Sequence, residues 1–225
     1  WFGRAAAQDH PKAQYWYAIM LQEGYGVIPN DKSALEWFGK AAGHGLAPAQ
    51  LNLAKMYRDG IGTEPDYAQA LKWFEKAAGQ GNFRAQNNLA GMYFLGQGVE
   101  PDYAEALKWF TKAAEQGHAK AQYNLGEMFR IGTGVKQDEA AAVEWYHKAA
   151  EQGVIRARYR LGISYRDGKG VTQNYVHAHM WLNLAGASGL EDALDRRDEV
   201  AEKMTVQQVA HAQRLADDWR ATHKK

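Results

Sequence analysis

The side chains that could carry out chemistry are not grouped at catalytic or metal-binding spacings. His177 and His179 are two residues apart, and on a helix this spacing directs the rings away from each other rather than toward one metal ion. Asp217 and Asp218 are adjacent and belong to a charged helix face. Three further histidines lie in predicted turns without acidic residues at ligand spacing: His10, His44 and His118. The sequence therefore predicts a protein that is not an enzyme and has no metal or cofactor.

Glycine-rich loops are a second candidate for chemistry, because such loops hold phosphate groups when a strand precedes them and a helix follows. Gly96 and Gly98 form one Gly-x-Gly pair, and equivalent pairs recur at a step of 36 residues. Both flanking segments have helical patterns. We interpret the pairs as turns, with the first glycine ending a helix in the left-handed conformation.

Tryptophan recurs at the same step. The series is Trp1, Trp37, Trp73, Trp109, Trp145 and Trp181, each 36 residues after the one before. Columns of alanine and glycine keep this step without insertion or loss, which is typical of stacked helical repeats. The rings could stack on sugars, but their strict period and aromatic neighbours favour a core position. We therefore predict that Trp109 is buried and that its truncation costs about 3–5 kcal/mol.

Each period contains two helical patterns. In the first, Ala49, Leu53 and Met56 recur at spacings of three or four residues and form one helix face. The second begins at an N-cap such as Asp102, with Glu105 placed to close a capping box. One partial helix, five pairs and two terminal helices give thirteen. The predicted fold is an all-α solenoid of antiparallel helix pairs with a 36-residue repeat.

The period is lost near the C-terminus. Leu190 to Lys203 has the pattern of a helix, and Thr205 with Gln208 predicts a capping box that opens a last helix through about Trp219. The end of a solenoid must present a polar outer face, as these segments do. We predict a repeat array over residues 1–189, with one partial and five further repeats, and capping helices over residues 190–225 of the same continuous domain.

Composition excludes several classes of partner. The formal net charge is +1 with both signs interspersed, so no basic patch indicates nucleic-acid binding. No apolar run approaches the ~20 residues that cross a bilayer, so we expect no membrane insertion. The absence of cysteine excludes disulfides and thiolate metal sites.

The repeat resembles the Sel1-like repeat family, a relative of the tetratricopeptide repeats. The matching stretches are Ala106–Gly117, Ala121–Gly126 and Gly132–Val135, and the tail from Ala178 to Trp219 is similar to the ending of bacterial members. The resemblance implies a right-handed superhelix of helix pairs that acts as an adaptor or scaffold, often in the bacterial envelope. We therefore expect a periplasmic or secreted protein.

Some members of that family carry cysteine pairs, and some have been described as beta-lactamase-like. This chain has no cysteine and no Ser-x-x-Lys motif. Its serines are followed three residues later by acidic residues: Ser33 by Glu36, Ser164 by Asp167, and Ser188 by Glu191. The beta-lactamase-like activity is therefore not carried over to this chain. A hydrolase of that type stays only as the third alternative, tested by activity on a chromogenic beta-lactam.

The candidate binding surface is the face of each first helix that points away from the core columns. In helix-pair solenoids this helix lines the concave surface, and packing does not dictate these side chains. The predicted contact residues are Trp16, Asn52, Lys55, Asn88, Tyr123, Asn124, Glu127, Tyr159 and Arg160. The asparagine amides either clamp an extended peptide or satisfy backbone groups between repeats. Trp16 is either a binding hot spot or packs on a preceding helix.

The predicted function is a non-enzymatic scaffold or adaptor that binds a peptide or protein segment in its concave groove. The alternative is an envelope protein that binds carbohydrate or helps a polysaccharide-export complex to assemble. Peptide-array binding and glycan pull-down distinguish the two.

Overall fold

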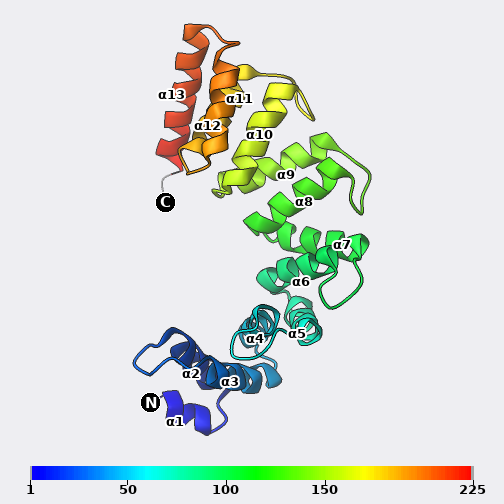
Figure 1. Ribbon diagram of the computed structural model, residues 1–225, viewed down its shortest axis with the longest axis vertical. Helices are drawn as coiled ribbons and strands as arrows, with labels where there is room; N and C mark the ends of the chain where they lie inside the picture. Colours follow the sequence, from blue (N-terminus) through cyan, green and yellow to red (C-terminus); the bar gives the residue numbers. More distant parts are fainter. Residues whose placement is uncertain (1, 224–225) are drawn as a thin grey trace. The chain divides into compact units, whose positions relative to one another are not determined.

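The computed structural model describes residues 2–223, and this part of the chain is helical throughout, with thirteen α-helices and no strand (Figure 1). The helices are α1 (Phe2–Ala7), α2 (Pro11–Glu23), α3 (Asp31–Gly43), α4 (Ala47–Asp59), α5 (Tyr67–Gly79), α6 (Phe83–Leu95), α7 (Tyr103–Glu115), α8 (Ala119–Ile131), α9 (Glu139–Glu151), α10 (Ile155–Asp167), α11 (Tyr175–Gly186), α12 (Glu191–Ala201) and α13 (Val206–Thr222). Consecutive helices pack as pairs, such as α2 with α3 and α8 with α9. The predicted all-α solenoid and its number of helices are confirmed.

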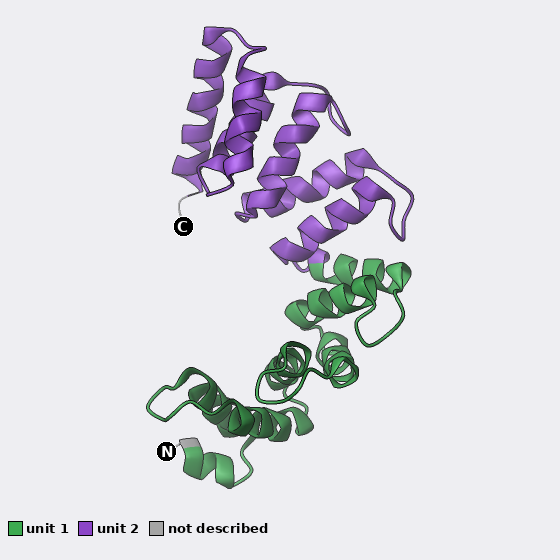
Figure 2. Ribbon diagram, viewed as in Figure 1, with its two compact units in different colours: residues 1–113 green, residues 114–225 purple. Residues whose placement is uncertain are grey.

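The chain divides into two compact units, residues 1–113 and residues 114–225 (Figure 2). The first unit holds α1 to α6 and most of α7, and α3 packs on both α2 and α4. The second unit holds α8 to α13, and α11 packs on α10, α12 and α13. Trp1, the first tryptophan of the periodic series, lies outside the described residues. The division into a repeat array and capping helices of one continuous domain stays a prediction.

Glycines end the first helix of each pair and let the following loop approach the neighbouring repeat. Gly60 ends α4 in the left-handed region with a φ of 69°, and its N–H donates to the Met56 carbonyl. Gly62 has a φ of 74°, and a Cβ at this position would lie 2.5 Å from the Asp31 carbonyl oxygen at the start of α3. The Gly-x-Gly pattern is therefore accounted for by backbone contact between repeats.

Polar N-caps begin the second helices, as the sequence predicts. The Asp66 carboxylate accepts the Gln69 N–H at 2.9 Å, and the other caps follow the same pattern. At α7 the Asp102 carboxylate accepts the Glu105 N–H at 2.9 Å, but the Glu105 carboxylate accepts from Lys108 Nζ at 2.8 Å. A complete capping box is formed at the start of α13, where Thr205 and Gln208 satisfy each other's backbone N–H groups.

The aromatic pair in each second helix has a different arrangement from the predicted one. The buried member is the residue after the tryptophan: Phe38, Phe74, Phe110 and Tyr146. Trp73 and Trp109 are only partly buried, and Lys76 Nζ lies 4.1 Å from the centroid of the Trp73 ring. The prediction that Trp109 is buried is therefore wrong in part. Successive residues on an α-helix point about 100° apart, so only one of two adjacent rings can face the interior. Trp73 packs instead at the edges of two successive hydrophobic clusters and bridges neighbouring repeats.

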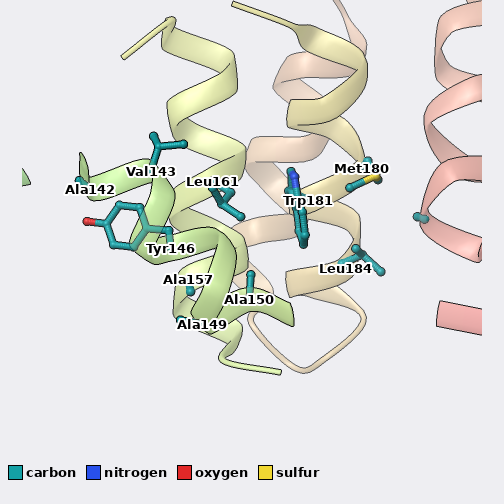
Figure 3. Packing of buried hydrophobic residues seen from close by; sticks show 11 residues of the cluster. Ala142, Val143, Tyr146, Ala149, Ala150, Ala157, Leu161, Met180, Trp181 and Leu184 are labelled. Carbon is teal, nitrogen blue, oxygen red and sulfur yellow. The ribbon is translucent and has the colours of Figure 1, made fainter. Parts of the chain in front are cut away.

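The core of the second unit joins α9, α10 and α11. Figure 3 shows Leu161 and Trp181 within this core, while the Tyr146 ring lies at its edge with the hydroxyl directed away from the other side chains. Trp181 is 4% exposed because Trp219 of α13 packs edge-on against it, with ring centroids 5.9 Å apart. The Arg158 guanidinium lies 4.4 Å from the centroid of the Trp219 ring. The last helix is thus attached to the repeats by aromatic and cation–π contacts.

Candidate ligand-binding site

The nine residues predicted to contact a partner are divided between the two units. Four lie on α2, α4 and α6 of the first unit: Trp16, Asn52, Lys55 and Asn88. Five lie on α8 and α10 of the second unit: Tyr123, Asn124, Glu127, Tyr159 and Arg160. All nine belong to the first helix of a pair, and each has accessible surface.

In the first unit, two of these side chains differ in what they offer to a partner. Trp16 is 52% exposed and packs edge-on against Tyr15, with ring centroids 5.4 Å apart. The Asn88 amide already has protein partners on both sides. Its Nδ2 donates to the Arg84 carbonyl at 2.7 Å, and its Oδ1 accepts from Arg58 Nη1 at 2.6 Å. Asn88 therefore links α6 to α4, whereas Trp16 presents an aromatic surface to solvent.

In the second unit, Glu127 joins three helices. Arg160 of α10 donates to both carboxylate oxygens of Glu127, from Nε at 2.9 Å and from Nη2 at 3.0 Å. Arg130, one turn along α8, donates from Nη2 at 3.0 Å. The Tyr146 hydroxyl of α9 donates to the same carboxylate. Two predicted contact residues, Glu127 and Arg160, are thus paired with each other across consecutive repeats.

The electrostatics of this cluster favour the charged carboxylate. Burial disfavours the charge on Glu127, but the hydrogen bonds from Arg130 and Tyr146 and the charge of Arg160 outweigh it, so the pKa of the carboxyl lies below its ordinary value. Burial and the adjacent carboxylate both raise the pKa of the Tyr146 hydroxyl, because they disfavour the phenolate. Near neutral pH the cluster therefore consists of one carboxylate, two guanidinium groups and a neutral phenol.

A shallow pocket of about 220 Å³ lies beside this cluster. It is lined by side chains of α8, α10 and the start of α12: Tyr123, Arg156, Tyr159, Arg160, Leu190 and Asp192. Hydrogen bonds tie the Tyr123 hydroxyl to Arg160, and the Tyr159 hydroxyl to Asp192 and Arg196. Burial raises the pKa of both phenols, and a nearby carboxylate raises it further: Glu127 for Tyr123 and Asp192 for Tyr159. The pocket therefore has two neutral aromatic walls and charged groups at its rim.

Three lining residues were not among the predicted contacts: Arg156, Leu190 and Asp192. Arg156 had a signal in the sequence, because it belongs to a column with the 36-residue step that is basic in four of five repeats: Lys12, Pro48, Arg84, Lys120 and Arg156. Leu190 and Asp192 had none, since they lie beyond the last periodic glycine. Their contribution to the pocket depends on how α12 folds back on α11.

A column of buried glutamines was also absent from the candidate residues. Its members are Gln14, Gln50, Gln86 and Gln122, all at most 5% exposed. Gln122 Nε2 donates to the Ala114 carbonyl at 3.2 Å, and its Oε1 accepts from Gln152 Nε2 at 2.8 Å. Gln50 makes the same two kinds of contact, to Ala42 and from Gln80. Gln86 Nε2 likewise donates to the Ala78 carbonyl, so in three of the four repeats the amide satisfies backbone at the end of the preceding second helix, whereas Gln14 Nε2 donates to the Asp9 carboxylate.

Histidines gather in the second unit without forming a metal site. His147 packs edge-on against Trp181, and its Nε2 lies 3.3 Å from the Tyr165 hydroxyl. The His177 ring stacks on the Tyr165 ring, with ring centroids 5.2 Å apart. His179 is 3% exposed, and its Nδ1 has no hydrogen-bond partner in the described chain. Between residues 2 and 223, no three His, Cys, Asp or Glu residues are placed to share a metal ion. Nor is any described helix both long and apolar enough to cross a membrane.

These histidines predict that acid weakens the second unit. Burial lowers the pKa of His147, His177 and His179 below 6.5. The unfolded chain then binds more protons than the native one, so stability is complete above about pH 6.5 and falls as the pH drops below it, by at most about 1.4 kcal/mol per pH unit for each group. The titratable or charged neighbours are Glu151 and His177 near His147, His211 near His177, and Arg197 and Asp198 near His179.

The measurement is guanidinium chloride unfolding at pH 7.5 and pH 5.5, followed by far-UV circular dichroism. His179→Met replaces the titrating imidazole with an apolar side chain of similar length that can fill the same buried site. We expect the variant to lose less stability than the wild-type protein between the two pH values. An equal loss in both proteins would contradict the assignment.

Comparison with known proteins identifies five repeats in the chain. The Sel1 repeat family matches residues 11–46, 47–82, 83–118, 119–154 and 155–190. Each matched segment covers the first helix of a pair, its Gly-x-Gly loop and the second helix. A comparison with curated proteins gives no match.

Solved structures show the same architecture. A protective antigen of uropathogenic Escherichia coli with an SLR fold is 34% identical, with a TM-score of 0.89 over 99% of this chain and 47% of the antigen. A Sel1 repeat protein from Oxalobacter formigenes is 35% identical, with a TM-score of 0.80 over 89% of this chain and 58% of that protein. A sel1 repeat protein from Klebsiella pneumoniae is 25% identical, with a TM-score of 0.55 over 89% of this chain and 97% of that one.

The chain spans about half the length of the first two of these proteins. Over that span, the 36-residue step, the helix pairs and the family match describe the same five repeats. The chain belongs to the Sel1 repeat family.

Proposed function

We propose that this protein is a non-enzymatic scaffold that binds a peptide or protein segment on the exposed face of its first helices. Sel1 repeats generally mediate protein interactions and are generally not catalytic. The observation that supports this face most directly is the pocket on α8 and α10, because it contains three of the residues chosen from the sequence: Tyr123, Tyr159 and Arg160.

The chemistry of the face suits a polypeptide partner. Tyrosine, tryptophan and arginine are the residue types that most often dominate protein interfaces, since each combines a large contact area with polar groups. In the first unit Trp16 is half exposed, at the position equivalent to Arg160 in the second. Rigid helices hold these side chains, so little conformational entropy is lost when a partner binds.

The test starts from a partner obtained without assumptions about its sequence. Dodecapeptides are selected from a random display library on the immobilised chain, and a selected peptide is titrated by calorimetry. Trp16→Ala is expected to weaken binding ~30-fold or more for peptides that reach the first unit, because an interface tryptophan contributes about 2 kcal/mol or more. Circular dichroism of each variant confirms that the fold is retained.

Matched controls lie on the outer face of the second helices. Lys72 of α5 and Glu144 of α9 occupy the same repeat position and are exposed, so Lys72→Ala and Glu144→Ala should leave affinity unchanged. Loss of affinity in these variants, with none in Trp16→Ala, would place the partner on the opposite face. Binding to a glycan array with no peptide selected would favour the carbohydrate alternative instead.

A further inference from the structure

The pocket of the second unit is too small for a whole ligand. Its volume of about 220 Å³ is below the ~300–1,000 Å³ of typical small-molecule sites. It is also open to solvent on a surface formed by three helices. A pocket of this kind fits one or two side chains of a larger partner.

The charges around the pocket are unequally engaged. The Arg160 guanidinium donates twice to Glu127 and also contacts the Tyr123 hydroxyl, so its planar fork is occupied. Asp192 accepts from Tyr159 and lies 4.0 Å from Arg196 Nε. Arg156 differs from both, because its exposed side chain forms no ion pair or hydrogen bond within residues 2–223.

The position of Arg156 makes its free charge available to a ligand. It lies in the first turn of α10 and lines the pocket together with Tyr123 and Leu190. A guanidinium group binds a carboxylate through two parallel hydrogen bonds, and this geometry is stronger and more specific than contact with a point charge. The adjoining tyrosine rings and the leucine offer apolar surface for a neighbouring side chain.

We propose that this pocket binds an acidic residue of a partner polypeptide through Arg156, with an adjacent apolar side chain of the same segment resting on Leu190 between Tyr123 and Tyr159. This inference rests on the proposed function and adds a preferred ligand chemistry to it. Asp192 also lines the pocket, and its negative charge disfavours a second carboxylate there. The partner segment therefore combines one acidic residue with an apolar neighbour.

The test uses fluorescein-labelled octapeptides in matched sets. Each peptide contains aspartate or glutamate next to leucine or phenylalanine, and its counterpart carries asparagine or glutamine instead. Both are made with free and amidated C-termini, which separates a side-chain carboxylate from a terminal one. Fluorescence anisotropy with the full chain is expected to show at least 10-fold tighter binding of the amidated acidic peptides than of their neutral counterparts.

Two variants assign this preference to one residue. Arg156→Gln should reduce the preference to less than about 2-fold, while Arg156→Lys should retain part of it because it keeps the charge but not the fork. Lys120→Gln is the control, since Lys120 is the exposed equivalent one repeat earlier, and it should bind as the wild-type chain does. Circular dichroism confirms folding of all three.

The outcomes separate this inference from the proposed function. Equal binding of acidic and neutral peptides, or a preference that survives Arg156→Gln, would overturn the pocket assignment and leave the scaffold function intact. A preference that depends on the free C-terminus would show that a terminal carboxylate is the ligand, and would overturn the side-chain assignment. If neither these peptides nor a display library yields a binder, both proposals fail.

Discussion

Phe74→Ala is expected to lower the free energy of unfolding by about 3–5 kcal/mol, the range for truncation of a large buried aromatic residue. Phe74 is fully buried and packs with Leu89 and Met92 in the core of the first unit. Trp73→Ala should cost less than Phe74→Ala, although tryptophan is the larger residue. The Trp73 ring is partly exposed and has Lys76 over one face, so its removal leaves a smaller cavity.

Urea unfolding followed by circular dichroism compares these variants with Lys72→Ala, which lies on the exposed side of the same helix and should be nearly silent. Amide hydrogen exchange then shows which helices the substitution destabilises. In a repeat array each unit contacts only its neighbours, so Phe74→Ala should increase exchange first in α4 to α6. A larger loss of unfolding free energy for Trp73→Ala than for Phe74→Ala would show that the tryptophan, and not the phenylalanine, is the main core residue.

This pair of residues illustrates how far the period alone predicts the structure. A constant step identifies which positions are equivalent, and it therefore predicts the helices, their caps and the glycine turns. It does not decide which of two adjacent, equally periodic aromatic residues faces inward. Burial of Phe74 rather than Trp73 depends on how far each second helix is rotated about its own axis, and packing against the neighbouring helices sets this rotation.

The candidate site was predictable to a different extent. The choice of the first helix of each pair identified the pocket side chains Tyr123, Tyr159 and Arg160. The contacts within that surface depend on combinations that do not repeat. Glu127 is paired with Arg160 because an acidic residue in one repeat meets a basic residue in the next. The equivalent residues one repeat earlier, Gly91 and Asn124, cannot form such a pair.

The pairing of Glu127 gives the second large expected effect. Glu127→Gln should lower the free energy of unfolding by roughly 2–3 kcal/mol. Breaking a fully buried pair costs about 3–5 kcal/mol by leaving a charge without compensation. The Glu127 side chain is 19% exposed and its two arginine partners are each 31% exposed, so solvent reduces the cost. Because the pKa of Glu127 lies below 4.5, this stabilisation is present above that pH and is lost as the pH falls through the native-state pKa.

A double-mutant cycle with Arg160→Met separates a structural from a ligand-binding role for these two residues. If they act as a pair, the double variant should lose less stability than the sum of the single variants, by about 1–3 kcal/mol. Glu144→Gln on the exposed face of α9 is the matched control for removal of a single charge.

A peptide selected on the chain is titrated against the same variants. If the two losses of stability are additive and peptide affinity falls, Glu127 and Arg160 each contact the peptide, as the sequence predicts for this face. If coupling is found and Glu127→Gln also releases Arg160 for a carboxylate, acidic peptides should bind the variant more tightly than the wild-type chain, because a second guanidinium group then faces the pocket beside Arg156.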